Sequence, residues 1–94
     1  GWGEGLKEAA LYLESITEEG NTVGIALVPS HTLPPMRKAV VKKYTKTELY
    51  DFVMVNYYNV IREGFPIDEL NTKYKLIHTV NADNAPLIFI FKRK

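Results

Sequence analysis

Two short apolar segments decide the fold of this chain: TVGIALV, residues Thr22–Val28, and DFVMVNY, residues Asp51–Tyr57. Both are apolar almost throughout and rich in β-branched or aromatic residues, which is typical of strands buried on both faces of a sheet. The connection between them has about twenty residues, and a parallel crossover needs a dozen or more. The sequence therefore predicts that these two strands are neighbours in one sheet and run parallel.

A helix is expected ahead of these strands, over Glu4–Glu19. Trp2 lies on the extension of its apolar stripe, whose members recur at helical spacing: Leu6, Ala9, Ala10, Leu13 and Ile16. Glu4 lies near the positive end of the helix dipole, where a carboxylate is favoured. Gly20 supplies a left-handed stop at the other end.

The middle of the chain is less regular. The segment PSHTLPP, residues 29–35, contains three prolines, which exclude regular structure there. In MRKAVVKKY, which begins at Met36, we favour a strand over Ala39–Tyr44. A second helix is expected over Pro66–Lys73, with Ile67, Leu70 and Tyr74 as its buried face.

The C-terminal segments KLIHTVN and PLIFIFK, residues 75–81 and 86–92, predict an antiparallel hairpin because a turn-rich tetrapeptide separates them. The expected order of elements is α-β-(β)-β-α-β-β. This order indicates a small mixed β-sheet with two main helices packed on it, of the α/β class, with α+β as the alternative.

Size and composition exclude several classes of protein. The 94 residues suffice for one domain, and the net charge of +1 gives no electrostatic argument for nucleic acid as a partner. The chain has no cysteine, so it forms neither disulfides nor thiolate metal sites. No apolar run approaches the roughly 18 residues of a membrane span, and the N-terminus lacks the pattern of a signal peptide.

The search for catalytic chemistry predicts no catalytic residue, no metal and no cofactor. His31 and His78 have no second ligand at metal-binding spacing. His78 alternates with Leu76 and Val80, and we interpret it as a partly buried structural histidine. Ser30 lacks the context of a nucleophile elbow, so a hydrolase built on Ser30 and His31 is a distant alternative.

Two basic segments allow two interpretations each. One contains Arg37, Lys38, Lys42, Lys43 and Lys46, and the other is the tail Lys92–Lys94. Both segments could meet lipid phosphates, where each basic residue contributes about 1 kcal/mol, and the alternative for the first segment is a solvated loop face. For the tail we favour the alternative of a solubilising end.

Polar and aromatic residues follow the second buried strand in NYYN, residues 56–59. Ligands bind at the carboxyl ends of strands in open α/β sheets. Asn56, Tyr58 and Asn59 are therefore candidate ligand-facing residues for a sugar or peptide. The alternative is that these residues pack the edge of the sheet.

The opening segment WGEGLKEAALYL, residues 2–13, resembles the segment that follows the last membrane span in prokaryotic polytopic glycosyltransferases. These enzymes are related to dolichyl-phosphate-mannose protein mannosyltransferases and to lipid A aminoarabinose transferases. Members often carry Trp-Gly-Glu-Gly, then Leu, Ala-Ala and Tyr-Leu, and the matching residues are Trp2, Gly3, Glu4, Gly5, Leu6, Ala9, Ala10, Tyr12 and Leu13.

A second segment, YDFVMVNYYNVIREGFP, is similar to a family pattern of an Asp-Tyr-Val-Val strand, a polar aromatic stretch, Arg and a Pro-led helix. The matching residues are Asp51, Val53, Val60, Arg62 and Pro66. Two departures are Phe52, where the family usually has Tyr, and Asn56, where an aromatic residue is common. The resemblance spans nearly the whole chain and is weakest from Pro29 to Glu48.

The resemblance implies a soluble C-terminal domain, residues 1–94, on the extracytoplasmic side of a larger membrane protein. The family's catalytic acids lie in the membrane-embedded part, so this domain is not expected to transfer sugar alone. Its expected partners are that membrane-embedded part and either lipid headgroups or a polyprenyl-phosphate sugar. The candidate membrane or docking surface comprises Trp2, Glu4, Arg37, Lys38 and Arg62.

The glycines around Trp2 are expected to give a flexible exit from the membrane, and Trp2 itself suits the membrane–water interface. The alternative for Trp2 is the first core residue of the first helix. The alternative function, of a different class, is a free-standing small α/β module that binds a ligand or a protein.

Overall fold

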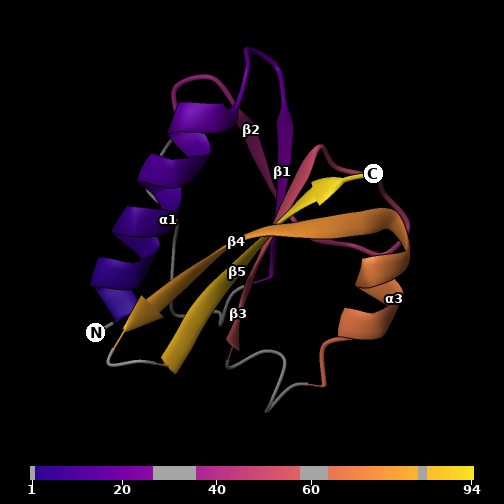
Figure 1. The fold of residues 1–94 in the computed structure, drawn as a ribbon. Coiled ribbons are helices and arrows are strands. Elements are labelled where there is room, and N and C mark those ends of the chain that lie inside the picture. Colours follow the sequence, from indigo (N-terminus) through magenta and orange to yellow (C-terminus); the bar gives the residue numbers. More distant parts are fainter. Residues whose placement is uncertain (1, 27–35, 58–63, 83–84) are drawn as a thin grey trace.

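The computed structural model describes residues 2–26, 36–57, 64–82 and 85–94, with side chains for all of these except residues 2–4 and 82. Two helices and five strands are described (Figure 1). They are α1 (Trp2–Ile16), β1 (Thr22–Ala26), β2 (Val40–Lys43), β3 (Phe52–Asn56), α3 (Ile67–Lys73), β4 (Tyr74–Ala82) and β5 (Ala85–Arg93). The predicted α/β class and order of elements are confirmed.

The strands form one mixed sheet in the order β2-β1-β3-β5-β4. β1 pairs in parallel with β2 on one side and with β3 on the other, where Val23 lies opposite Phe52 and Ala26 opposite Val55. The predicted parallel pairing of the two apolar strands is therefore confirmed. β5 runs antiparallel to both β3 and β4, which confirms the C-terminal hairpin.

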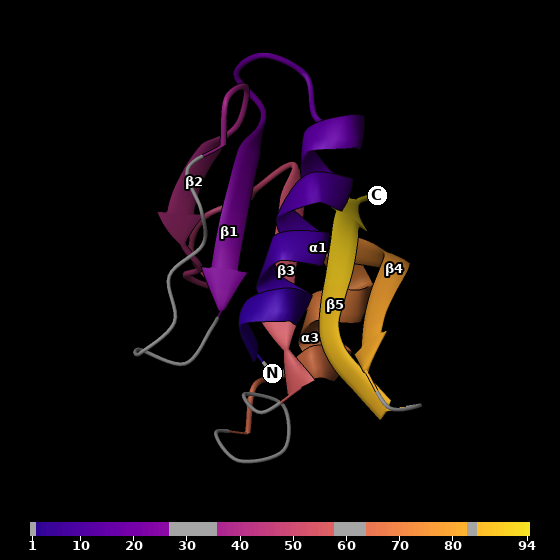
Figure 2. The ribbon, with the colours of Figure 1, turned by 90° about the vertical axis from the view of Figure 1, so that its left-hand side faces the viewer.

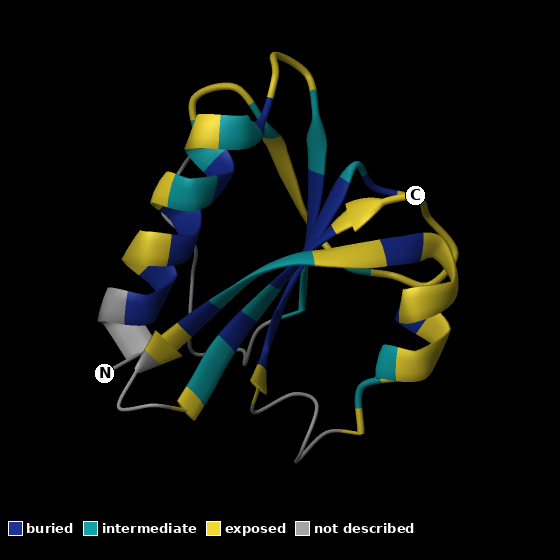
Figure 3. Cartoon of the chain, in the orientation of Figure 1, coloured by how far each residue is buried: buried dark blue, intermediate teal, exposed yellow. Residues whose placement is uncertain are grey.

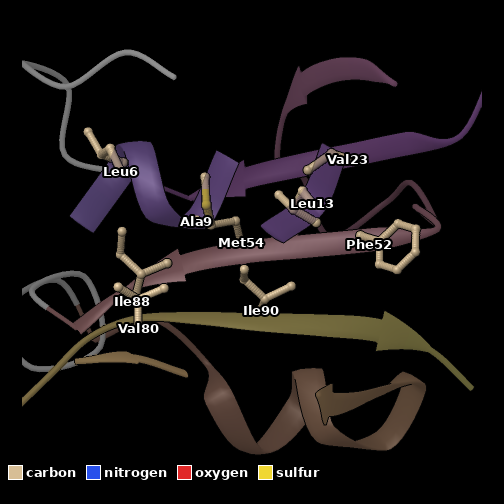
Figure 4. Packing of buried hydrophobic residues seen from close by; sticks show 9 residues of the cluster. All are labelled: Leu6, Ala9, Leu13, Val23, Phe52, Met54, Val80, Ile88 and Ile90. Atoms are coloured by element: carbon tan, nitrogen blue, oxygen red, sulfur yellow. The ribbon is translucent and has the colours of Figure 1, made fainter. Parts of the chain in front are cut away.

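One helix covers each face of the sheet (Figure 2). On the α1 face, Leu6, Ala9 and Leu13 pack on side chains from the strands in one buried cluster (Figure 4). On the α3 face, Leu70 packs with a second cluster comprising Tyr50, Val53, Val55, Tyr74 and Phe91. All five residues of β3 are buried because helices lie on both sides of this central strand, whereas β2 is exposed along its length at the edge (Figure 3).

The ends of α1 differ from the prediction. The helix begins at Trp2, so Gly3 and Gly5 are helical, and the expectation that they form a flexible exit is wrong. Gly5 is buried, and a Cβ atom there would lie 3.1 Å from Cδ1 of Leu87, so the glycine allows the first turns to approach β5. The helix ends at Ile16 rather than Glu19, because the chain turns back at Gly20, whose φ is +84°.

Two details of β4 also correct the sequence interpretation. Tyr74 was assigned to the buried face of the second helix, but it is the first residue of β4, and its extended backbone ends α3. The register of β4 against β5 shifts between Leu76 and His78, so one extra residue lies in β4 there. Leu76 lies opposite Phe91 and His78 opposite Ile90, which places the two side chains on opposite faces instead of the same face.

His78 is partly buried, as predicted, and its ring stacks on that of Tyr12 from α1. The ring centroids are 3.8 Å apart with an interplanar angle of 7°. This contact holds α1 against the outer strand β4, so His78 has a structural role.

Candidate functional site

The candidate residues lie at two opposite ends of the molecule. At one end of the molecule α1 begins and β1 and β3 have their carboxyl ends, and we call this end the start pole (Figure 1). Gly5 lies beside Ile88, and Ile88 is opposite Asn56 in the sheet, so the beginning of α1 and the end of β3 are neighbours. The C-terminal end of β5 and the end of α1 lie at the opposite pole (Figures 1 and 2).

Among the candidate ligand-facing residues, only Asn56 lies within the described part of the chain. It is 1% exposed and lies on the α1 face opposite Ile88, so its side chain is part of the interior at the start pole. Tyr57 next to it is exposed, and the centroid of its ring lies 6.2 Å from the centroid of the Phe89 ring. Tyr58 and Asn59 fall outside the described residues.

The candidate docking residues do not all come together. Trp2 and Glu4 belong to the first turn of α1 at the start pole. The backbone N–H of Arg37 donates to Oε1 of Glu14 at 2.7 Å, and Lys38 accepts from the backbone N–H of Gly20 at 3.0 Å.

Glu14 lies twelve positions after Trp2 in α1, which corresponds to about 18 Å along the axis. The side chains of Arg37 and Lys38 are exposed, but they extend from the far half of the molecule. Arg62, Ser30 and His31 fall outside the described residues.

At the opposite pole a polar clamp joins the starts of β1 and β3. Oδ2 of Asp51 accepts hydrogen bonds from the backbone N–H of Thr22 at 2.8 Å and from its hydroxyl at 3.3 Å. In return the backbone N–H of Asp51 donates to the Thr22 hydroxyl at 3.0 Å. Arg93 contacts the other carboxylate oxygen at 3.5 Å, so each carboxylate oxygen of Asp51 has a partner within the fold.

A pocket of about 310 Å³ lies beside this clamp. We call it the clamp pocket. Its apolar lining comes from Ile16 and Phe52, and its polar lining is Glu18, Asn21, Asp51, Lys92, Arg93 and Lys94. The basic tail, which the sequence interpretation treated as a solubilising end, therefore belongs to the wall of a pocket.

The tyrosines near β2 form a separate polar and aromatic group. The hydroxyl of the buried Tyr50 donates to the carbonyl of Lys43 at 3.1 Å and accepts from the backbone N–H of Thr45 at 2.9 Å. The centroid of the Tyr44 ring lies 5.6 Å from the centroid of the Tyr50 ring and 5.3 Å from that of the Phe65 ring. Burial, with a smaller effect of nearby ionisable groups, raises the pKa of the Tyr44 phenol above 10.0.

Metal and membrane features were also sought. No group of three or more His, Cys, Asp or Glu residues that could hold a metal ion occurs within residues 2–26, 36–57, 64–82 and 85–94. In the same ranges, no helix is long and apolar enough to cross a membrane.

Comparison with known proteins found no matching family model, no matching curated protein and no matching solved structure.

Proposed function

We propose that this chain is the extracytoplasmic accessory domain of a membrane glycosyltransferase that uses a polyprenyl-phosphate-linked sugar. In this proposal the domain docks on the membrane-embedded part of the same polypeptide or covers its acceptor site. It does not transfer sugar alone, because the catalytic acids of the family it resembles lie in the membrane-embedded part. The observation that carries the proposal is the segment WGEGLKEAALYL at the start of the chain.

The positions of the two matched segments support docking through the start pole. The first begins with the first turn of α1, and the described part of the second runs along β3 towards Asn56. The contact of Gly5 with Ile88, and the pairing of Ile88 with Asn56, bring these segments together at one end of the molecule. Trp2 and Glu4 are the docking candidates at this pole, and Arg62 belongs to the second matched segment, in the part that lies outside the described residues.

The basic residues Arg37 and Lys38 have a different place in the proposal. They extend from the half of the molecule that lies away from the start pole, near Glu14 and Gly20. A surface that meets the membrane through Trp2 would not include them unless α1 lay parallel to the bilayer. We therefore assign the docking role to the start pole alone.

The clamp pocket favours the second candidate function, a free-standing α/β module that binds a ligand. Pockets of about 300 Å³ or more are the usual size of small-molecule sites. This pocket lies at the amino ends of β1 and β3, whereas the sequence indicated a ligand at their carboxyl ends.

The first test of the accessory-domain proposal is the coding sequence upstream of Gly1. Several apolar segments of about 20 residues each are expected there. A start codon directly beside Gly1 would contradict the proposal and leave the free-standing module.

The second test uses the full-length protein in membranes. Trp2→Ala and Arg62→Ala should each lower sugar transfer at least tenfold, about 1.4 kcal/mol, while the isolated domain keeps most of its stability against urea. Leu11→Ala is the matched control, because Leu11 is 63% exposed on the outer side of α1. If both variants unfold the domain while the folded fraction keeps normal specific activity, the two residues are structural and docking loses its support.

A further inference from the structure

We propose that the clamp pocket binds the phosphate group of a water-soluble molecule. The pocket-lining cations that would hold the phosphate are Lys92, Arg93 and Lys94, and Lys75 lies opposite Lys92 in the sheet. They belong to the open end of the β4–β5 hairpin, where the two strands bring basic residues side by side.

The strongest observation is a like-charge pair in the sheet. Lys75 of β4 lies directly opposite Lys92 of β5, and Lys92 lines the clamp pocket. Directly opposite side chains have Cβ atoms about 5 Å apart, and like charges in this position destabilise a sheet. In the described part of the chain, neither lysine has a carboxylate within 4.0 Å. A bound anion between them would remove this repulsion.

The acidic residues of the pocket neutralise only part of the positive charge. Asp51 is held by Thr22 and Arg93, so its charge is already shared within the clamp. Glu18 is exposed, just beyond the end of α1. Glu18 and the negative end of the helix dipole together carry about −1.5 elementary charges, so the three lysines Lys75, Lys92 and Lys94 keep an excess of positive charge.

The walls of the pocket are fixed before any ligand arrives. The backbone N–H of Arg93 donates to the carbonyl of Asp51 at 3.0 Å, and that of Lys94 donates to the carbonyl of Lys73 at 2.9 Å. The cationic side chains therefore extend from a rigid backbone, which lowers the entropy lost when they bind a ligand. Arg93 and lysines are the side chains best suited to phosphate oxygens, because all are donors that carry a full charge.

The position of the pocket decides between two sources of phosphate. The pocket lies at the end of α1, and the 15 residues of this helix place it about 20 Å from the start pole. If the start pole faces the bilayer, lipid headgroups of that bilayer do not reach the pocket. The choice of a soluble source thus rests on the proposed function, whereas the phosphate site itself does not.

The experiment is an NMR titration of the ¹⁵N-labelled 94-residue chain with inorganic pyrophosphate at constant ionic strength. We expect saturable shifts of the backbone amides of residues 16–21, 51–52 and 92–94. Lys92→Gln should weaken binding about tenfold, the effect of one charge-assisted hydrogen bond. Lys43→Gln is the matched control, because it removes the same charge from the exposed strand β2 at the other edge of the sheet and should leave binding unchanged.

A stability measurement on the same variants adds a second readout. Lys92→Gln removes the repulsion from Lys75, so without ligand and at low salt it should unfold at a higher urea concentration than the wild type. At one pyrophosphate concentration, the midpoint should rise more for the wild type and for Lys43→Gln than for Lys92→Gln. Together these results would separate a binding residue from a structural one.

Three outcomes would overturn the proposal. Shifts that rise linearly with pyrophosphate and include β2 would mean general ionic screening. Equal binding by the wild type and Lys92→Gln would mean that the clamp pocket is not the site. Binding to phosphatidylglycerol vesicles that requires Lys92, without any response to pyrophosphate, would mean a lipid ligand instead of a soluble one.

Discussion

Replacing Gly24 with alanine should lower the free energy of unfolding by about 3 kcal/mol, mainly through overpacking. Gly24 lies in β1 on the α3 face, where the ring of Tyr50 covers it. A Cβ atom on residue 24 would lie 2.7 Å from Cδ2, 2.8 Å from Cε2 and 2.9 Å from Cγ of that ring. These distances are far below van der Waals contact, so either the ring or the strand must move.

The ring of Tyr50 cannot move without losing other interactions. Its side chain is completely buried, and its hydroxyl is bonded to the carbonyl of Lys43 and the N–H of Thr45. Overpacking of a core costs about 1–3 kcal/mol, and each weakened hydrogen bond adds about 0.5–1.5 kcal/mol. Alanine in place of glycine in a strand stabilises the folded state by about 0.5–1 kcal/mol. The net loss in the free energy of unfolding is therefore about 3 kcal/mol.

The assay is urea unfolding followed by circular dichroism. With a slope of about 1 kcal/mol/M, the midpoint of Gly24→Ala should fall by about 3 M. Gly5→Ala is the matched control. Gly5 is also buried, but its nearest neighbour is the flexible end of Leu87 at 3.1 Å, and the helix propensity of alanine offsets the contact by about 1 kcal/mol.

A double variant tests the stated cause. In a Tyr50→Leu background the ring is absent, so adding Gly24→Ala should cost much less than it does in the wild type. A loss below 1 kcal/mol for Gly24→Ala alone, or an undiminished loss in the Tyr50→Leu background, would refute the argument that the glycine is required by the tyrosine ring.

Two further predictions concern single polar groups. Thr17→Val should raise the free energy of unfolding, measured with urea, by about 1 kcal/mol. The reason is that Thr17 is buried and its hydroxyl has no hydrogen-bond partner among the described residues. Thr17→Ser, which keeps the hydroxyl and loses the methyl group, should not stabilise the protein. The raised pKa of Tyr44 means that the folded state holds this proton more tightly, so above the unfolded value of 10.0 the stability should fall as the pH rises towards the folded pKa. Tyr44→Phe should make the fall in stability above this pH less steep, and an unchanged slope would show that Tyr44 is not responsible.

The sheet was predictable from the sequence because its strands satisfy simple physical rules. Residues 51–57 are apolar at nearly every position, which requires cover on both faces, and α1 and α3 provide it. The long connection after β1 permits a parallel crossover, and β1 and β3 are indeed parallel neighbours. Both inferences depend on local composition and chain length, which are visible in one sequence.

Features that depend on pairing between distant residues were not predictable. The extra residue in β4 leaves the apolar pattern of the strand intact, so His78 was placed on the wrong face relative to Leu76. The clamp pocket requires that the end of α1 meet the end of β5, and the opposition of Lys75 and Lys92 requires the register of the hairpin. In the sequence alone, three consecutive basic residues at the end of a strand are equally compatible with a solvated tail.

The structure explains many of the residues on which the family resemblance is based. At these positions the residue type is required by packing or by hydrogen bonds within the fold. Gly5 lets α1 approach β5, Asp51 clamps β1 to β3, and Val53 is fully buried in the α3-face cluster. A sheet of the same topology would select these residues without any membrane partner, so their match does not by itself favour a membrane partner.

The functional part of the resemblance is tested through Trp2 and Arg62, the residues on which the docking proposal depends. The phosphate proposal depends instead on Lys75 and Lys92, whose opposition the fold would avoid if stability alone selected them. The two sets of residues lie in separate parts of the chain, so their variants answer independent questions. A domain that binds phosphate through Lys92 and loses no transfer activity on Trp2→Ala would be a ligand-binding module, whatever precedes it in the polypeptide.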